Sequence, residues 1–569
     1  LHIGETYVLH EKETPEGYLP AEDVSFTIED TAEVQLVRME DELIPKLQTT
    51  ATVDDDHVEK PTGAVEIVDK VDYEDLVPRR SYTLHATLMD KATGEAVLDA
   101  EGKAIAAELT FTPVTSSGSI NVTFKIEDAS VMEGKTTVVF ESISKNGKEL
   151  ATHADLTDEG QTIWWPEIHT TAAVEGDHVS MADGEIDLVD TVKFLNLQPG
   201  KEYTVTGKLM DKVTGEVILD ADGNEITASQ NFTPDEPDGS VDITFHIMDA
   251  SILMGKTTVA FETVSYGDRE LAIHADINDD DQTVYFPEIG TTATVDGEHE
   301  VPRDRTMTLV DVVEYQSLEP GKEYTVKGIL MDAKTGEPFK QGDKEISAEI
   351  TFTPDKPDGT VELSFEFDSS VLTEDTTLVA FETVYNGEKE VAVHADLKDE
   401  GQTVIIKVPT MHTTATIGGK KEATASDKLL LDDVVSYTGL IVGKEYTVKG
   451  VLMDKATGKP YLVNGKEVTA ETKFTPEKPD GEVTVTFQFD ASGIHSKTAI
   501  VVFETMYQDD LEILVHTDLE DSDQTVTIDK PGTPQTGDTL TARYFILGGA
   551  ALVFAAIILL AYLRGRKRD

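Results

Sequence analysis

One pattern occurs four times along this chain at a nearly constant interval. A Thr-Thr pair begins each copy, with its first residue at 49, 170, 291 and 413, so successive copies are 121, 121 and 122 residues apart. Each copy ends with a His that is followed eight positions later by a Gln. An interval this long has room for complete strands and turns, and it indicates tandem copies of a whole domain.

The composition excludes one class of partner and one means of stabilisation. The 569 residues include 109 acidic and 47 basic side chains, a formal net charge of −62, whereas phosphate binding needs a basic face. Nucleic acid is therefore excluded as a partner, and the charge indicates a solvated, self-repelling surface. Because the chain has no cysteine, its stability has to come from packing or from a cross-link other than a disulfide.

Within each copy the residue pattern is that of β-strands. Residues 201–210 alternate between apolar and polar types, and the turn that follows at 211–215 ends in a glycine, which supplies the positive φ of a tight hairpin. A second hairpin is expected around Asp222-Gly223. The sequence Phe-Thr-Pro, whose proline cannot donate to a strand ladder, is expected to end a strand at Phe111, Phe232, Phe352 and Phe474. We therefore predict an all-β chain of tandem immunoglobulin-like antiparallel β-sandwiches.

The links between the copies contain apolar residues and a proline, as in Tyr285-Phe286-Pro287, so they should be semi-rigid and the domains should form a rod. The predicted boundaries are 1–47 for a distinct N-terminal segment, 48–167, 168–288, 289–409 and 410–530 for repeats 1 to 4, 531–543 for a linker, 544–563 for a transmembrane helix and 564–569 for a basic tail.

The C-terminal sequence predicts where the protein is located. Residues 544–563 contain no charged residue and are long enough to cross a bilayer as a helix. The tail at 564–569 is basic, and since positive charge stays on the cytoplasmic side, everything before the span should be outside the cell. The pentapeptide at 533–537, Thr-Pro-Gln-Thr-Gly, stands shortly before the span.

This order of pentapeptide, apolar span and basic tail resembles the sorting signal of Gram-positive cell-wall proteins. The resemblance implies that a sortase cuts between Thr536 and Gly537 and joins Thr536 covalently to peptidoglycan, while the span at 544–563 holds the protein in the membrane before sorting. Thr533 stands where such signals usually have Leu, which leaves the class of sortase open. A plain single-pass membrane anchor is the alternative.

The N-terminal segment has a signature of its own. Its residues 7–18, which include Tyr7, Glu11 and Tyr18, resemble the "YxLxExxAPxGY" sequence of Cna-B (SpaA-like) domains. That resemblance implies that Glu11 catalyses an isopeptide bond and that Asp41 stands at the acceptor position. The lysine would lie upstream of Leu1, so we expect the chain to be the C-terminal portion of a longer protein. A strand–turn–strand with incidental acids is the alternative.

Five reactive residue types return in the same order in every copy. They are the opening Thr, an Asp, a Glu that follows an apolar Val-x-Phe, the His and the Gln. The residues are Thr49, Asp69, Glu141, His153 and Gln161; Thr170, Asp190, Glu262, His274 and Gln282; Thr291, Asp311, Glu382, His394 and Gln402; and Thr413, Asp433, Glu504, His516 and Gln524.

These residue types suit one reaction, the formation of a Thr–Gln ester with loss of ammonia. A Thr hydroxyl needs a base to act as a nucleophile, and a Gln carboxamide needs its carbonyl polarised. The apolar run before the Glu suggests that both faces of its strand are covered, which raises the pKa of the carboxyl so that it can donate a proton. The polar turn between His and Gln is expected to place them opposite one another on neighbouring strands.

The constellation resembles the Thr–Gln ester-bond domains, the VaFE-repeat family of Gram-positive surface proteins, over about residues 48 to 530. The motif Val-Ala-Phe-Glu stands at 259–262 and 379–382. The resemblance implies that the first Thr of each pair is joined to the Gln of its own repeat, that Asp and Glu share a proton and polarise the Gln carbonyl, and that His assists proton transfer. Such a protein modifies itself once and is not an enzyme acting on an external substrate; we expect neither a cofactor nor a metal.

Other interpretations account for fewer of these residues. A metal site of His, Asp and Glu gives no reason for Thr and Gln to recur, and a hydrolase would need a nucleophile elbow that is absent from the sequence. We predict the structural stalk of an adhesin anchored in the wall of a Gram-positive bacterium, whose missing N-terminal region binds an unknown host ligand. A sortase-polymerised pilus subunit is the first alternative, and repeats that bind a host ligand themselves are the second.

Overall fold

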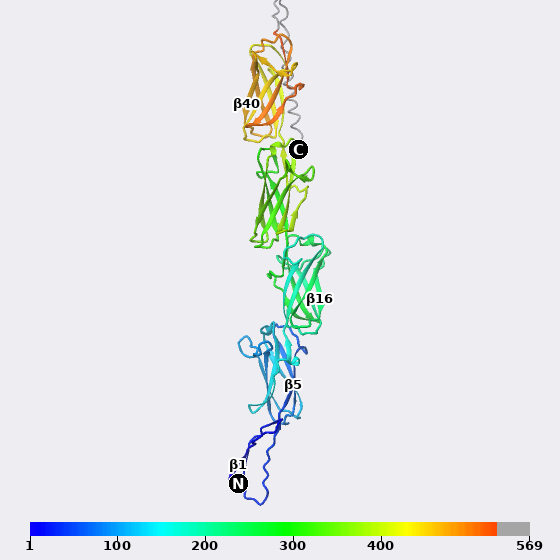
Figure 1. Cartoon of the computed structure of the whole chain (residues 1–569), viewed down its shortest axis with the longest axis vertical. Coiled ribbons are helices and arrows are strands. Elements are labelled where there is room, and N and C mark those ends of the chain that lie inside the picture. Colours follow the sequence, from blue (N-terminus) through cyan, green and yellow to red (C-terminus); the bar gives the residue numbers. More distant parts are fainter. Residues whose placement is uncertain (532–569) are drawn as a thin grey trace, which may run out of the picture. The chain divides into compact units, whose positions relative to one another are not determined.

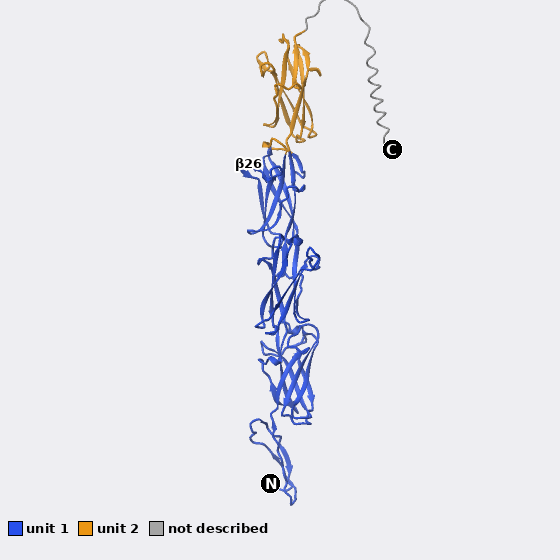
Figure 2. Cartoon of the chain, turned by 90° about the vertical axis from the view of Figure 1, so that its right-hand side faces the viewer, with its two compact units in different colours: residues 1–301, 305–369, 376–406 blue, residues 302–304, 370–375, 407–569 orange. Residues whose placement is uncertain are grey.

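The computed structural model describes residues 1–531 in two compact units (Figure 2). Unit 1 contains Leu1–Val301, Arg305–Ser369 and Thr376–Ile406, and unit 2 contains Pro302–Asp304, Ser370–Asp375 and the chain from Lys407 onward. Thr536, Gly537, the predicted span 544–563 and the basic tail all lie outside the described residues. Within residues 1–531 no helix has the length and apolar character needed to cross a membrane.

Each repeat is built on two mainly antiparallel sheets, seen in Figure 1 as a separate bundle of strands. In repeat 2 the strand order is β13-β14-β17 in one sheet and β16-β15-β18-β19 in the other, where β20 also pairs with β18. The elements of repeat 2 are β13 (Glu167–Val174), β14 (Ile186–Leu195), β15 (Tyr203–Asp211), β16 (Thr227–Phe232), β17 (Gly239–Ile247), the 3₁₀ turn η3 (Ala250–Leu253), β18 (Lys256–Tyr266), β19 (Arg269–His274) and β20 (Thr283–Phe286).

Repeat 1 has the same order, β5-β6-β9 in one sheet and β11-β10-β7-β8 with β12 in the other. Its elements are β5 (Lys46–Val53), β6 (Val65–Glu74), β7 (Tyr82–Asp90), β8 (Ala106–Phe111), β9 (Gly118–Ile126), η1 (Ala129–Met132), β10 (Thr136–Lys145), β11 (Lys148–His153), η2 (Glu159–Gln161) and β12 (Thr162–Trp164).

Repeats 3 and 4 keep this plan and add short strands. Some of these extend the larger sheet, whereas β26–β27 and β38–β39 form separate two-stranded sheets, and β34 pairs with β44 in parallel. Repeat 3 contains β21 (Glu288–Thr294), β22 (Glu300–Pro302), β23 (Met307–Gln316), β24 (Tyr324–Asp332), β25 (Glu337–Pro338), β26 (Lys340–Gln341), β27 (Lys344–Glu345), β28 (Ser347–Phe352), β29 (Gly359–Phe367), η4 (Ser369–Val371), β30 (Thr376–Asn386), β31 (Lys389–His394) and β32 (Thr403–Lys407). Repeat 4 contains β33 (Thr410–Thr416), β34 (Glu422–Thr424), β35 (Leu429–Thr438), β36 (Tyr446–Asp454), β37 (Lys459–Pro460), β38 (Leu462–Val463), β39 (Lys466–Glu467), β40 (Thr469–Phe474), β41 (Gly481–Phe489), β42 (Thr498–Gln508), β43 (Leu511–His516) and β44 (Thr525–Asp529).

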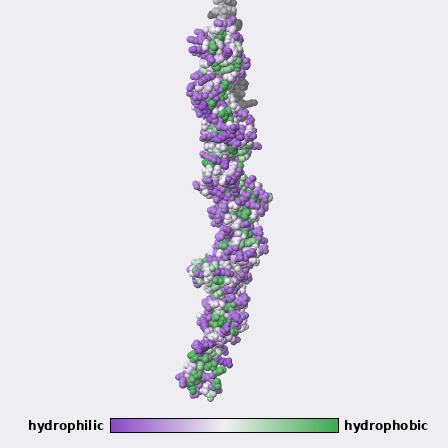
Figure 3. All heavy atoms as spheres, viewed as in Figure 1, coloured by the Kyte–Doolittle hydropathy of each residue, from purple (hydrophilic) through white to green (hydrophobic). Residues whose placement is uncertain are grey.

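The two sheets of each repeat enclose one apolar core. In repeat 2 the fully buried residues Leu188 and Phe245 come from the three-stranded sheet, and Tyr203, Val205 and Val264 come from the other. Burial alternates along each strand, because successive side chains point to opposite faces. The predicted all-β fold of tandem antiparallel β-sandwiches is confirmed. The face of the chain shown in Figure 3 is mostly hydrophilic, in keeping with the large excess of acidic residues.

The turns and strand ends predicted from the sequence are also present. Asp211 accepts hydrogen bonds from the backbone N–H groups of Val213 and Thr214, and Gly215 has a φ of 69°. Gly223 in the second hairpin has a φ of 86°. The four strands predicted to stop at Phe-Thr-Pro end at Phe111, Phe232, Phe352 and Phe474.

The N-terminal segment forms two small pairs of strands rather than a sandwich. Strand β1 (Thr6–Leu9) pairs with β3 (Val24–Thr27), and β2 (Tyr18–Leu19) pairs with β4 (Glu42–Leu43).

Candidate functional site

Strand alternation separates the two threonines that open each repeat. In β13 the first of them, Thr170, shares the core face with Ala172 and Val174 and is only 4% exposed. Thr171 points to the opposite face and is not buried. The other repeats show the same difference between Thr49, Thr291 and Thr413 and their following neighbours. Only the first Thr can therefore react with groups inside the sandwich, a choice that the residue types alone left open.

An Asp and a Glu from opposite sheets meet beside this threonine. Asp190 lies on β14, whose residue Val192 pairs with Thr170, and Glu262 lies on β18 of the other sheet. Both carboxyl groups are buried, with exposures of 0% and 1%. The expectation that both faces of the Glu strand are covered is only partly met, because Phe261 is half-buried.

Gln282 completes a three-way contact. The hydroxyl of Thr170 donates to Glu262 Oε2 at 3.0 Å, and the side-chain amide of Gln282, itself 0% exposed, donates both to Glu262 Oε2 and to Thr170 Oγ1. The same three contacts occur in repeats 1, 3 and 4. In repeat 3 the amide nitrogen of Gln402 lies 2.6 Å from both Thr291 Oγ1 and Glu382 Oε2.

The remaining polar atoms of this group have no hydrogen-bond partner. Both carboxyl oxygens of Asp190, Glu262 Oε1 and Gln282 Oε1 are buried and unpaired, and so are their equivalents in every repeat. Two ionised carboxylates in such a place would each lack solvation, whereas one proton shared between the two acids pairs Glu262 Oε1 with one oxygen of Asp190. Burial, together with the charge of Asp190, raises the pKa of Glu262 far above its ordinary value, and burial raises the pKa of Asp190 as well. The pair of Asp190 and Glu262 therefore holds a proton at neutral pH.

The buried acids make the stability of an uncross-linked chain depend on pH. When all four reactive Thr residues are replaced by Ala, we expect the Tm measured by calorimetry to fall as pH rises from about 5 to 9. Above the ordinary Glu pKa of about 4.3 the unfolded chain releases protons that the raised-pKa acids keep in the folded state, so unfolding becomes more favourable with pH. Adding Glu→Gln at 141, 262, 382 and 504 should flatten this slope; a Tm that does not fall in the parent would contradict the assignment.

The histidine faces this group from the strand next to the Glu. His274 on β19 lies directly opposite Glu262 on β18. Its Nε2 donates to Asp279 Oδ2 at 2.8 Å, which leaves Nδ1 as the acceptor. In repeat 4 the corresponding atom, His516 Nδ1, is 3.2 Å from the hydroxyl of Thr413, so it can accept the proton of the nucleophile.

One part of the predicted geometry is wrong. His274 and Gln282 are not cross-strand neighbours, because β19 and β20 pair with different stretches of the same edge of β18. The partner of the His across the ladder is the Glu, not the Gln. The residues between His and Gln form a turn that carries the chain from one stretch of this edge to the next.

A sixth recurring residue, the Asp that accepts a hydrogen bond from the His, was not among those predicted from the sequence. It stands five positions after the His and three before the Gln in every repeat, and this constant offset was the available signal. These residues are Asp158, Asp279, Asp399 and Asp521, and their distances to the His Nε2 are 2.9, 2.8, 3.0 and 3.1 Å.

Replacing Asp279 by Ala should slow cross-linking of repeat 2 by about 10²-fold or more, since it removes the group that fixes the tautomer of the general base. The fraction of cross-linked peptide, followed by mass spectrometry at successive times after synthesis, measures the effect. Asp280→Ala is the matched control, because its side chain is 93% exposed. Equal rates for the two variants would contradict a role for Asp279. Asp279→Asn keeps an acceptor for the N–H of Asp281 but removes the carboxylate. It therefore separates stabilisation of the turn from the effect on His274.

The two predicted isopeptide residues, Glu11 and Asp41, differ in exposure, and Glu11 is half-buried. Glu11 Oε2 accepts from the N–H of Ala21 at 2.7 Å and from the hydroxyl of Thr14 at 3.1 Å, and Asp41 is exposed. Their role in an isopeptide bond stays a prediction. Within residues 1–531 no group of three or more His, Asp or Glu side chains is arranged to hold a metal ion.

Comparison with known families gives the same four repeats. The sequence model of a family described as "T-Q ester bond containing domain" matches residues 45–165, 166–286, 287–406 and 409–528. Among curated proteins, no sequence matches the chain.

The solved structures matched by the chain have low sequence identity to it and low TM-scores. A Mobiluncus mulieris adhesin containing intramolecular disulfide, isopeptide and ester bond cross-links is 14% identical, with a TM-score of 0.24 over 43% of this chain and 99% of its own. The ICAM-5 D1–D4 ectodomain fragment is 11% identical, with a TM-score of 0.28 over 85% of this chain and 100% of its own. Elastase-activated Escherichia coli alpha-2-macroglobulin is 9% identical, with a TM-score of 0.17 over 92% and 50% of the two chains.

Proposed function

Because the chain belongs to the family of T-Q ester bond containing domains, we propose that each repeat joins its first Thr to its own Gln without an external catalyst. The observation that carries the proposal is the same buried contact of Thr, Gln and Glu in all four repeats. The repeat is thus its own single substrate, and the reaction occurs once.

The reaction begins at the threonine hydroxyl. His274, with Nε2–H held by Asp279, takes the proton of Thr170, and Oγ1 attacks the side-chain carbonyl carbon of Gln282. As the new C–O bond forms, the C–N bond of the amide breaks. The leaving NH₂ group takes up the proton that came from the hydroxyl and departs as ammonia, so the balance is one ester and one ammonia.

The acid pair assists by donating a hydrogen bond to the developing oxyanion. In the structure the amide nitrogen of Gln282 faces Glu262, whereas the carbonyl oxygen is unpaired. Half a rotation of the amide exchanges these atoms and places the carbonyl against the protonated Glu262. A neutral acid in a dry site is suited to this donation, since no reorganisation of water is needed.

The position of the bond gives it a mechanical role. Thr170 lies on the first strand of repeat 2, and Gln282 directly precedes the last strand, β20. An ester between them would carry tension from one end of the repeat to the other and leave the sandwich unloaded. We therefore propose that the four repeats are the load-bearing stalk of a surface adhesin, with a ligand-binding head in a longer protein.

Anchoring is proposed from the sequence at 533–569 alone. A sortase would cut between Thr536 and Gly537 and attach the stalk to peptidoglycan on the extracellular surface of a Gram-positive bacterium. Expression of the complete chain behind a signal peptide in such a host tests this. The protein should be found in the muramidase-released wall fraction, and Thr536→Ala should remove it from there. Equal wall fractions for both proteins would refute sortase anchoring.

The alternative is a pilus subunit polymerised by a sortase. It predicts ladders of covalent multimers that resist sodium dodecyl sulfate in the same wall fraction. A single anchored species favours the stalk of an adhesin.

A further inference from the structure

In repeat 2 the reactive histidine lines a cleft that is completed by the preceding repeat. The cleft has a volume of about 530 Å³. Repeat 2 contributes His274 and the neighbouring His169, while Pro61, Thr62 and Glu133 come from repeat 1.

Repeat 3 has an equivalent cleft against repeat 2. Its volume is about 490 Å³, and it is lined by His394 together with Met181, Asp183 and Met254 of repeat 2. Asp183 occupies the position of Thr62 one repeat further along the chain. The same arrangement therefore occurs at both junctions.

The histidine is the point at which the buried site approaches solvent. Thr170, Glu262 and Gln282 have exposures of 4%, 1% and 0%, whereas the side chain of His274 is 15% exposed. That of His394 is 22% exposed. His274 lines the cleft, whereas Thr170, Glu262 and Gln282 do not, so the cleft offers an approach to the carbonyl carbon of the Gln past this ring.

Charged contacts hold repeat 1 against the edge of this cleft. Arg269, on the same strand as His274, donates to the carbonyl of Val58 at 2.7 Å and pairs with Asp56 at 3.2 Å and with Glu59. Lys201 of repeat 2 pairs with the same Asp56.

The junction of repeats 2 and 3 uses the corresponding positions. Lys322 Nζ lies 2.8 Å from Asp177, and Lys389 donates to the carbonyl of Val179 at 3.0 Å. Charge-assisted hydrogen bonds of this kind, when partly buried, are stronger than neutral ones.

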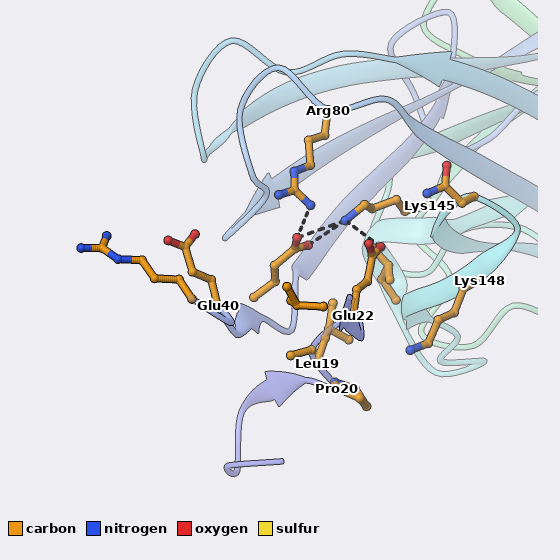
Figure 4. A pocket seen from close by; sticks show the side chains of 13 residues that line it. Leu19, Pro20, Glu22, Glu40, Arg80, Lys145 and Lys148 are labelled. Atoms are coloured by element: carbon orange, nitrogen blue, oxygen red, sulfur yellow. Dashed lines mark hydrogen bonds and ion pairs between the residues drawn. The ribbon is translucent and has the colours of Figure 1, made fainter. Parts of the chain in front are cut away.

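In repeat 1 the residue that corresponds to Lys201 contacts the N-terminal segment. Arg80, the counterpart of Lys201, pairs with Glu42, and Lys145 lies 3.1 Å from the same carboxylate (Figure 4). Each repeat in unit 1 thus holds the segment before it through a cation at one fixed position.

We propose that repeats 1 and 2 each shield the ester of the following repeat from small nucleophiles. The inference rests on the proposed function, since it presupposes the ester. Water or hydroxylamine would attack the acyl carbon of residue 282, the bond to Thr170 Oγ1 would break, and the threonine hydroxyl would be restored. Residue 282 would become Glu with water and a hydroxamate with hydroxylamine.

Hydroxylamine is a suitable probe because it is small and marks the cleaved residue. The complete repeat array, residues 1–531, is treated in three forms: wild type, Lys201→Ala with Arg269→Ala, and Lys322→Ala with Lys389→Ala. Peptide mapping gives the rate at which each cross-linked peptide is lost and each hydroxamate appears. Every molecule carries its own control, because each variant alters one junction and leaves the other intact.

The expected result is selective. The first variant should lose the Thr170–Gln282 ester about tenfold faster than wild type, with the Thr291–Gln402 ester unchanged, because removing the charged contacts favours opening of one junction. The second variant should show the reverse. Equal rates in all three proteins, or acceleration of both esters by either variant, would overturn the proposal.

A second pair of variants tests the cleft without removing a charged contact between the repeats. Thr62→Trp should narrow the first cleft and slow cleavage of the repeat 2 ester, and Asp183→Trp should do so for repeat 3. Unchanged rates would count against the proposal. If wild type contained no cross-linked peptide before hydroxylamine was added, the proposed function and this inference would both fail; unchanged rates with the esters present would overturn this inference alone.

Discussion

Replacing Gln402 by Ala should allow repeat 3 to lengthen under a force that leaves the wild-type repeats at their folded length. The ester would enclose the residues between Thr291 and Gln402, which are 111 positions apart. Without it, unfolding releases about 370 to 400 Å of chain, at ~3.3–3.6 Å per residue. Single-molecule pulling on the four-repeat array should therefore show one extension of this size in the variant and none in wild type.

The physical reason is that the ester joins the first strand of the repeat directly to the start of its last strand. Force then passes through a covalent bond and does not act on the hydrogen bonds of the ladders. Glu400→Ala is the control, because this exposed side chain lies two residues from Gln402 and is not part of the site. Full-length extensions of the wild-type repeats would contradict the load-bearing role, and so would a Gln402→Ala variant that does not extend.

The same substitution should also lower thermal stability. By analogy with a disulfide that closes a loop of this length, loss of the cross-link returns roughly 4 to 5 kcal/mol of entropy to the unfolded chain. A typical domain is stable by about 5 to 15 kcal/mol, so repeat 3 would become the least stable part of the array. This is the contribution that a cysteine-free chain cannot obtain from disulfides.

Replacing Glu262 by Gln should prevent the ester of repeat 2 from forming and leave the other three unaffected. Gln has nearly the same shape, but it cannot share a proton with Asp190 or donate the strong hydrogen bond of a carboxylic acid. We expect a rate of cross-linking lower by about 10³-fold, the range found when an acid or an oxyanion donor is removed. Peptide mapping would show free Thr170 and Gln282 peptides only in this repeat.

Glu270→Gln is the matched control, because Glu270 lies on the neighbouring strand β19 with 61% of its side chain exposed. It should cross-link as wild type does. A repeat 2 that completes its ester in Glu262→Gln at the wild-type rate would show that the buried acid pair does not take part in the reaction.

Much of this site could be predicted because the chain repeats itself. The period-two pattern and the glycine turns specify strands and hairpins, and five reactive residue types return at matching offsets. The sequence pattern could also have shown which Thr of each pair is buried, since Thr170, Ala172 and Val174 lie at alternate positions and therefore share one face of β13. Asp279 was missed because an Asp in a polar turn has an ordinary structural explanation.

The remaining features depend on strand register and on contacts between residues far apart in the sequence, which no local sequence pattern predicts. The pairing of His274 with Glu262 depends on a register shift between Val264 and Ser265, where the ladder is irregular. Such a bulge adds one residue on one strand and changes every pairing beyond it. The contacts between Arg269 and Val58 join residues 211 positions apart, so only the folded arrangement brings them together.

The most direct test of the central claim is the intact mass of the purified wild-type array under denaturing conditions. The proposed chemistry predicts a mass lower than that of the sequence by four molecules of ammonia. Thr170→Val should restore one of them, whereas Thr171→Val should retain the full deficit because its side chain points away from the core. A wild-type mass equal to that of the unmodified sequence would contradict the formation of ester cross-links in this protein.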